Sequence, residues 1–176
     1  MEQSTEKLSN FIEDTDNPII QVLQEFLSFL YLVKPIYSND RTLHNILLQA
    51  RKLHMRVLLD FFSNKRNPRY DDYRYNDFIT AAEDLSVFCP NNLWEFINKS
   101  LMHPSDKRGK LSVPTSDLEN VKNSLVESIE RFIKALDSKL NSEFAEFYKD
   151  DRIKVMKNKI LSDVCVVKFL NGPKGK

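Results

Sequence analysis

Residues 40–62 contain the most constraining feature of the chain, a helical pattern of apolar side chains that continues through the whole segment. Most of the residues that recur there at steps of three and four are apolar, which is the spacing of one continuous helical stripe. The stripe consists of Leu43, Leu47, Ala50, His54, Val57, Leu58 and Phe61. Further apolar side chains fill the neighbouring faces, so we expect other elements to cover this helix on more than one side. The pattern predicts a long central helix.

Four other segments carry helical patterns with recognisable starts. Asp16 or Asn17 can cap a helix in which Pro18 takes the first position. Thr115 is expected to cap the last strong helix, whose apolar residues keep nearly heptad spacing for more than six turns. The predicted helices are residues 18–34, 40–62, 78–87, 93–103 and 115–140.

Residues 149–176 form a basic C-terminal tail with one apolar patch, Ile160 to Leu170. The β-branched run inside the patch would suit a strand, but the chain offers no second strand to pair with it. We therefore expect the patch to be helical and the remainder of this partly docked tail to be irregular. With residues 1–16 as a flexible acidic N-terminus and residues 17–148 as the bundle, the sequence predicts an all-α single domain of five or six helices.

The overall charge gives no long-range attraction to nucleic acid or to an anionic membrane, because 26 Lys and Arg residues face 25 Asp and Glu residues. The ends differ. Residues 1–16 carry a net charge of −4, from five acidic residues and Lys7, and residues 149–176 carry +5, from eight basic and three acidic residues.

The two cysteines, Cys89 and Cys165, are too few for a disulfide framework or a thiolate metal site, which fits a reducing compartment. The first residues lack the positive and apolar regions of a signal peptide. The most apolar run, Pro18 to Val33, is interrupted by polar residues and is amphipathic, so no membrane span is expected. These features predict a cytoplasmic protein.

Several common chemistries have no basis in the sequence. The three glycines, Gly109, Gly172 and Gly175, cannot form a phosphate-binding loop, a dinucleotide fingerprint or a nucleophile elbow. The three histidines show no spacing typical of zinc ligands and no cysteine neighbours. No cofactor and no metal site are therefore expected.

Two groups of polar residues remain as candidates for function. The first lies on the central helix, where Arg56 and Asp60 are four residues apart and His54 falls on the apolar stripe. The second lies at the end of the helix around Trp94, beside a basic loop. It consists of Asn98, Lys99 and His103, with Lys107, Arg108 and Lys110 in the loop.

The segment from Ile97 to His103, following a long bundle helix, resembles the HEPN family of helical domains, and the resemblance extends over roughly residues 18–140. It implies a helical, usually dimeric fold and a metal-independent ribonuclease in which His103 would handle protons at the ribose 2′-hydroxyl and leaving group. Asn98 stands where the family has an Arg that steadies the phosphate, and Lys99 follows it. Lysine offers a point charge in place of the forked guanidinium.

Structural roles also explain these residues. His54 on an apolar stripe fits a hydrogen-bonded core histidine, and Arg56 with Asp60 fits an ion pair that braces the bundle. His103 suits the C-terminal end of a helix, where a cation is favoured. The Arg- and Tyr-rich connection of residues 65–75 fits a solvated loop, or a surface for single-stranded nucleic acid whose field is diluted by aspartates.

The function predicted from these observations is a non-catalytic helical interaction module that binds a protein partner or RNA. The alternative is a metal-independent endoribonuclease of HEPN type, with His103 as acid or base, Asn98 and Lys99 at the phosphate, and the basic loop attracting RNA. A homodimer is expected from the long seam of residues 118–140, which such helices often bury against a second copy, and from the family resemblance.

Overall fold

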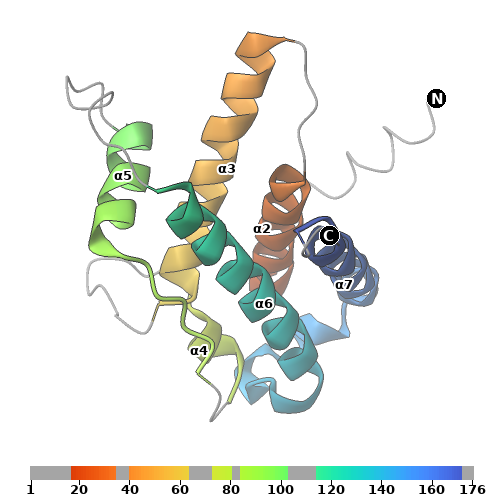
Figure 1. Cartoon of the computed structure of the whole chain (residues 1–176). Helices are drawn as coiled ribbons and strands as arrows, with labels where there is room; N and C mark the ends of the chain where they lie inside the picture. The colour runs from red at the N-terminus through yellow and green to blue at the C-terminus, as the bar shows by residue number, and fades with distance from the viewer. Residues whose placement is uncertain (1–16, 35–39, 64–72, 81–83, 103–113, 172–176) are drawn as a thin grey trace.

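The computed structural model describes residues 17–34, 40–63, 73–80, 84–102 and 114–171, with the main chain alone for residues 99–102 and 171. Within these residues the chain forms a single packed body of six α-helices and contains no strand, which confirms the all-α prediction (Figure 1). None of the described helices is long and apolar enough to cross a membrane. The helices are α2 (Pro18–Val33), α3 (Arg41–Phe61), α4 (Tyr75–Phe78), α5 (Asn91–Met102), α6 (Thr115–Lys139) and α7 (Asp151–Asn171), with the short 3-10 helices η1 (Ser142–Phe144) and η2 (Phe147–Lys149) between α6 and α7.

Local side-chain caps fix the starts of α2 and α3. The Asn17 carboxamide oxygen accepts hydrogen bonds from the backbone N–H groups of Ile19 at 3.0 Å and Ile20 at 3.3 Å. The Asp40 carboxylate does the same for Thr42 at 2.7 Å and Leu43 at 3.2 Å. These bonds satisfy amides that have no partner inside the helix. Both predicted helix starts are confirmed, whereas α6 is preceded by Pro114 and not capped by Thr115.

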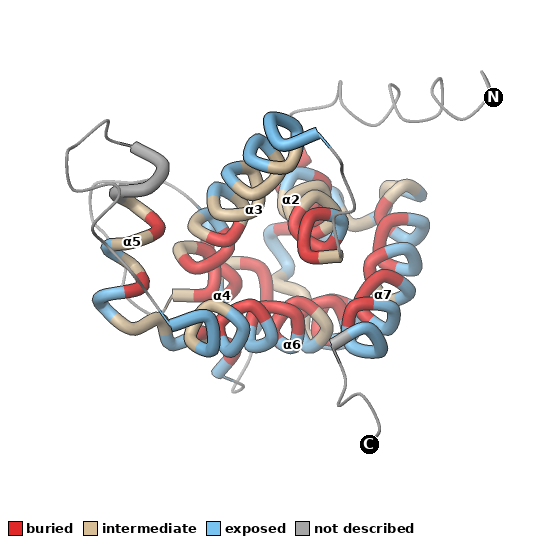
Figure 2. The backbone as a smooth tube through the Cα atoms, turned by 45° about the horizontal axis from the view of Figure 1, so that its top comes forward, coloured by how far each residue is buried: buried red, intermediate tan, exposed pale blue. Residues whose placement is uncertain are grey.

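Helix α2 is buried along its whole length, whereas α3 is buried only in its second half. Buried side chains occupy most of the circumference of α2, which packs against α7, α3 and α6. In α3 the buried residues, Met55, Leu58, Leu59 and Phe61, all lie in its second half. The first half extends past the ends of α2, α5 and α6 in Figure 1 and is largely exposed in Figure 2. The prediction of a central helix at residues 40–62 therefore applies to the second half of α3 and not to the first, because periodicity reveals apolar faces but not whether neighbours cover them.

Within the segment interpreted as a partly docked tail, α7 forms a structural helix, which agrees with the helix expected for Ile160 to Leu170 and extends it towards the N-terminus. Helix α7 makes the most extensive helix-helix contact in the described part of the chain, with α2. At its centre the Asp163 carboxylate, in a residue only 5% exposed, accepts hydrogen bonds from Lys34 Nζ at 2.8 Å and Lys159 Nζ at 3.0 Å. On its other side Lys157 bonds Asp137 of α6 and the Tyr148 hydroxyl. The buried apolar residues of α7 are Ile153, Met156, Ile160, Val164 and Val167.

The helix predicted at residues 78–87 does not form in the described residues of that range beyond Phe78, which are 79–80 and 84–87. Helix α4 ends at Phe78, and the chain then becomes extended and pairs with the end of α6. The Thr80 N–H donates to the Lys139 carbonyl and the Asn141 N–H donates to the Phe78 carbonyl, both at 2.7 Å. These backbone groups find their hydrogen-bond partners in another segment of the chain, so they do not need a helix to be satisfied.

A cluster of phenylalanines joins four helices at one end of the bundle. Phe26 of α2 lies 5.6 Å from Phe132 of α6 and 5.7 Å from Phe61 of α3, measured between ring centroids. Phe62 stacks on Phe26 at 5.8 Å, and Phe78 of α4 meets the edge of Phe132 at 6.1 Å. These separations are typical of favourable aromatic pairs.

The apolar seam of α6 is covered inside the same chain. Its buried residues include Val121, Leu125, Ile129, Phe132 and Leu136. Because α7, α3 and α2 cover this seam, it is not the surface for a second copy that the sequence suggested. A homodimer stays a prediction that rests on the family resemblance.

We expect Phe132→Ala to lower the free energy of unfolding by about 3–5 kcal/mol, because it removes a fully buried ring that touches three other helices and leaves a cavity. Urea denaturation followed by circular dichroism measures the change. Val155→Ala on α7, where the side chain is 59% exposed, is the control and should change stability by less than about 0.5 kcal/mol. A loss below about 1 kcal/mol for Phe132→Ala would show that the cluster does not hold the bundle together.

Asp163→Asn should lower stability by about 1–3 kcal/mol at neutral pH, since it removes the charge that Lys34 and Lys159 bond. Burial alone would raise the pKa of Asp163, but the two lysine hydrogen bonds outweigh it and the pKa lies below its ordinary value. The stabilisation is therefore complete above about pH 4–5 and is lost as pH falls through the folded-state pKa. Denaturation curves of both proteins should converge in acid. A gap that stays constant down to pH 2 would contradict the assignment.

Candidate interaction surface on helix α3

Only part of the predicted site falls on described residues. His103, Lys107, Arg108 and Lys110 lie outside them, as does the side chain of Lys99. Asn98 is half-buried on α5. The HEPN-type arrangement thus remains a prediction, and the described candidates are His54, Arg56 and Asp60 on α3.

His54 is held by a carboxylate from the neighbouring helix. Its Nδ1 lies 2.6 Å from Oε1 of Glu25 on α2, and both side chains are 24% exposed. A carboxylate at Nδ1 fixes the orientation of the ring and ties α2 to α3. Sequence reasoning singled out His54 but missed Glu25, because the two residues are 29 positions apart and no local pattern connects them.

Asp60 and Arg56 are both half-buried, and the ion pairs among the described residues do not include one between them. The main chain around Asp60 is held by Arg74, which the sequence indicated only as part of the Arg- and Tyr-rich connection of residues 65–75. Arg74 Nη1 donates to the carbonyl oxygens of Asp60 and Ser63, and the residue is only 7% exposed. Arg74 thus closes the end of α3 against the segment that leads into α4.

A groove lies between α2, the second half of α3 and Tyr73–Arg74. Its volume is about 520 Å³. The apolar lining consists of Pro18, Val22, Phe26, Val57, Leu58 and Phe61, and the polar lining of Gln21, Glu25, Asp60, Tyr73 and Arg74. The carboxylates of Glu25 and Asp60 line this groove, and the Arg74 guanidinium donates its hydrogen bonds to backbone carbonyls. Such a lining suits an apolar side chain better than a phosphate, which the carboxylates would repel.

The groove continues into an exposed apolar stripe along α3. The stripe is defined by Leu43, Ile46, Ala50, Leu53 and Val57, which alternate steps of three and four residues. Four of these side chains are strongly exposed, at 46% for Leu43, 58% for Ile46, 46% for Leu53 and 43% for Val57. Val57 also lines the groove, so stripe and groove form one surface. We call this surface the α3 stripe.

The stripe corrects the sequence interpretation of α3. Leu43, Ala50 and Val57 were expected to face the core, but Leu43 and Val57 are exposed and Ala50 is half-buried. Leu58 and Phe61 of the predicted stripe do reach the core, together with Met55 and Leu59. Two apolar faces were visible in the sequence, and nothing local shows which one the other helices cover.

Comparisons with models of protein families, with curated proteins and with solved structures give no match. The resemblance to HEPN domains therefore stays a hypothesis carried by residues 97–103. Among the described residues, no group of three or more His, Cys, Asp or Glu side chains is placed to hold a metal ion. The α3 stripe is the surface on which a function can be argued from geometry.

His54→Ala should lower the free energy of unfolding by about 1 kcal/mol, because it removes a partly buried hydrogen bond between α2 and α3. Gln49→Ala, an exposed residue of the same helix, is the matched control and should be close to neutral. Urea denaturation compares the two. Equal effects from both substitutions would show that the Glu25 contact does not brace the bundle.

Proposed function

We propose that the chain is a non-catalytic interaction module that binds a helical segment of a protein partner along the α3 stripe. The observation that carries this proposal is the exposure of Leu43, Ile46, Leu53 and Val57 on one face of a projecting helix. Contiguous apolar surface of this kind on a folded protein commonly marks a binding site. A second helix that places its own apolar residues at the same spacing would cover the stripe and exclude water from it.

A protein fits this surface better than RNA does. Single-stranded RNA is held by cations along its backbone and by aromatic side chains that stack on its bases. The stripe is aliphatic throughout and offers no ring on which a base could stack beside the cations of α3, and the adjoining groove carries Glu25 and Asp60. Apolar side chains of a partner helix would instead gain from burial of aliphatic surface, at roughly 25 cal/mol for each Å² removed from water.

The described residues around the groove also support a role without catalysis. Among the described residues, no serine or cysteine lines the groove. His54 could transfer a proton, but no described lining residue is placed as a nucleophile for it to activate. The half-buried Cys89 lies elsewhere, and burial raises its pKa to about 11, which leaves little reactive thiolate at neutral pH. The endoribonuclease alternative depends on His103, outside the described residues.

A neutral amphipathic peptide tests the proposal directly. The probe is a helix of roughly 21 residues, about 30 Å long, with Leu and Ile at steps of three and four and with Gln and Ser elsewhere. It is used at concentrations at which sedimentation shows it to be monomeric. We expect saturable binding in the micromolar range by fluorescence anisotropy, with the peptide gaining helicity.

The double variant Ile46→Asp with Leu53→Asp should abolish this binding without loss of stability, because both side chains are exposed. Val155→Asp with Val166→Asp on α7 is the matched control and should bind as the unaltered chain does. Equal binding by both variants would refute the assigned surface. Cleavage of a mixed RNA pool in EDTA, lost in His103→Ala, would replace the proposal with the endoribonuclease alternative.

A further inference from the structure

We infer that the partner helix is acidic along its flanks and that it comes from a different protein, not from a second copy of this chain. This inference rests on the proposed function and adds the chemistry of the occupant. The observation behind it is the distribution of charge on α3, which differs from that of the whole chain. The stripe supplies apolar contact, and the charges beside it select the partner.

Helix α3 has no acidic residue from Arg41 to Leu59. The same span carries Arg41, Arg51, Lys52 and Arg56. The chain as a whole is nearly neutral, with a formal net charge of +1, so this helix is a local concentration of positive charge. Interfaces pair such patches with negative ones, which speeds encounter and rejects partners of like charge.

Two of the four cations are already engaged within the chain. Arg51 donates from Nε to the Leu32 carbonyl at 2.8 Å and from Nη2 to the Lys34 carbonyl at 3.4 Å. Lys52 Nζ lies over the Phe96 ring of α5, 4.8 Å from its centroid. These contacts hold the two side chains against the bundle, although their charge still adds to the local field.

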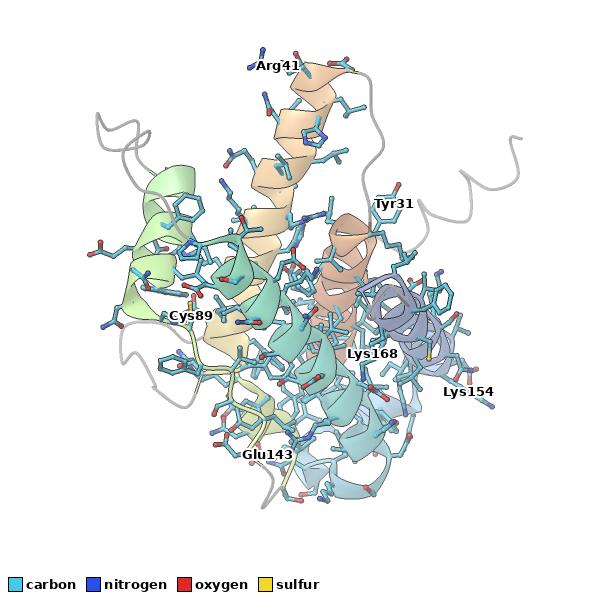
Figure 3. The ribbon with its side chains drawn as sticks, viewed as in Figure 1. Tyr31, Arg41, Cys89, Glu143, Lys154 and Lys168 are labelled. Carbon is cyan, nitrogen blue, oxygen red and sulfur yellow. The ribbon has the colours of Figure 1, made fainter. Side chains whose placement is uncertain are left out.

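Of the other two cations, Arg56 is placed beside the stripe and Arg41 lies at the start of α3. Arg41 lies at the free end of α3 and points away from the body of the protein in Figure 3. Arg56 precedes Val57 directly and lies seven residues after Gln49, on one flank of the stripe. At 100° per residue this flank is the position from which coiled-coil helices pair charges with a neighbour. Carboxylates of a partner helix would meet the Arg56 guanidinium, whereas Arg41, on the side of α3 away from the stripe, adds only to the local positive field.

The groove end of the surface has the opposite character. Glu25 and Asp60 stand there, and Glu25 is bonded to His54. Acidic residues on the partner should therefore lie on the flank that faces Arg56 and should be absent from the residues that enter the groove between Glu25 and Asp60. That end is expected to carry an apolar anchor side chain, which the Phe26 and Phe61 lining would receive.

A second copy of the chain does not satisfy this pattern. Pairing of two α3 stripes would bring together two helices that each carry four cations and no carboxylate between residues 41 and 59. Like charges on facing flanks destabilise helix pairs. The charge pattern thus disfavours self-association through the stripe and favours a heterologous helix.

Three versions of the probe peptide separate this inference from the proposed function. The neutral peptide measures docking on the stripe, and the other two carry either Glu or Lys at the flanking positions. At low salt we expect the Glu peptide to bind at least about tenfold more tightly than the Lys peptide. The difference should shrink in about 0.5 M NaCl, because exposed charges are then screened.

The variant Arg41→Glu with Arg56→Glu should reverse the preference between the charged peptides and leave binding of the neutral peptide nearly unchanged. Lys149→Glu with Lys154→Glu changes the net charge equally on exposed positions elsewhere and should leave the preference intact. Equal binding of Glu and Lys peptides, with the neutral peptide still bound, would overturn the inference while the docking surface stands.

Two further outcomes decide against the inference. Failure of all three peptides to bind would remove the proposed function and the inference with it. Sedimentation that shows a dimer of the unaltered chain, converted to a monomer by Ile46→Asp with Leu53→Asp, would identify a second copy as the occupant. Selective binding of the Glu peptide, with no self-association through the α3 stripe, is the result that we expect.

Discussion

The phenylalanine cluster is the contact on which the rest of the bundle depends. It brings rings from α2, α3, α4 and α6 together at one end of the body, with Phe26 and Phe132 near its centre. The second half of α3 is fixed by this cluster and by Arg74, which bonds the Asp60 carbonyl. Because all of these contacts lie at one end, the first half of α3 needs no neighbour to keep its direction and can project from the body.

Local chemistry allowed the starts and types of several helices to be predicted from sequence. Asn17 with Pro18, and Asp40, act on amides two or three residues away, so the signal and the effect lie in the same short segment. The extended segment after Phe78 could not be predicted in this way, because its hydrogen bonds go to Lys139 and Asn141. Helix α7 did carry a helical pattern of apolar residues at Ile153, Met156 and Ile160. The lysines between these positions obscured that pattern.

In the candidate site, too, the residues within one helix could be predicted from the sequence, and their contacts with other segments could not. His54 and Asp60 were selectable as polar residues within an apolar helix. Their partners, Glu25 and Arg74, come from other segments and have no pattern that points to them. The stripe of Leu43, Ile46 and Leu53 was visible as periodicity, yet its exposure depends on where α2 and α5 end. Burial is a property of the assembled bundle, so a single helix sequence does not contain it.

Helix α3 is held at one end only, because its buried residues all lie in its second half. The last turns share in the cooperative core, whereas the first turns are supported mainly by the Asp40 cap and by backbone hydrogen bonds. Opening of those first turns would expose little that is not already in water, so local stability should rise steadily along the helix towards Phe61. A surface of this kind can adjust its curvature to an incoming helix while the body that carries it stays unchanged.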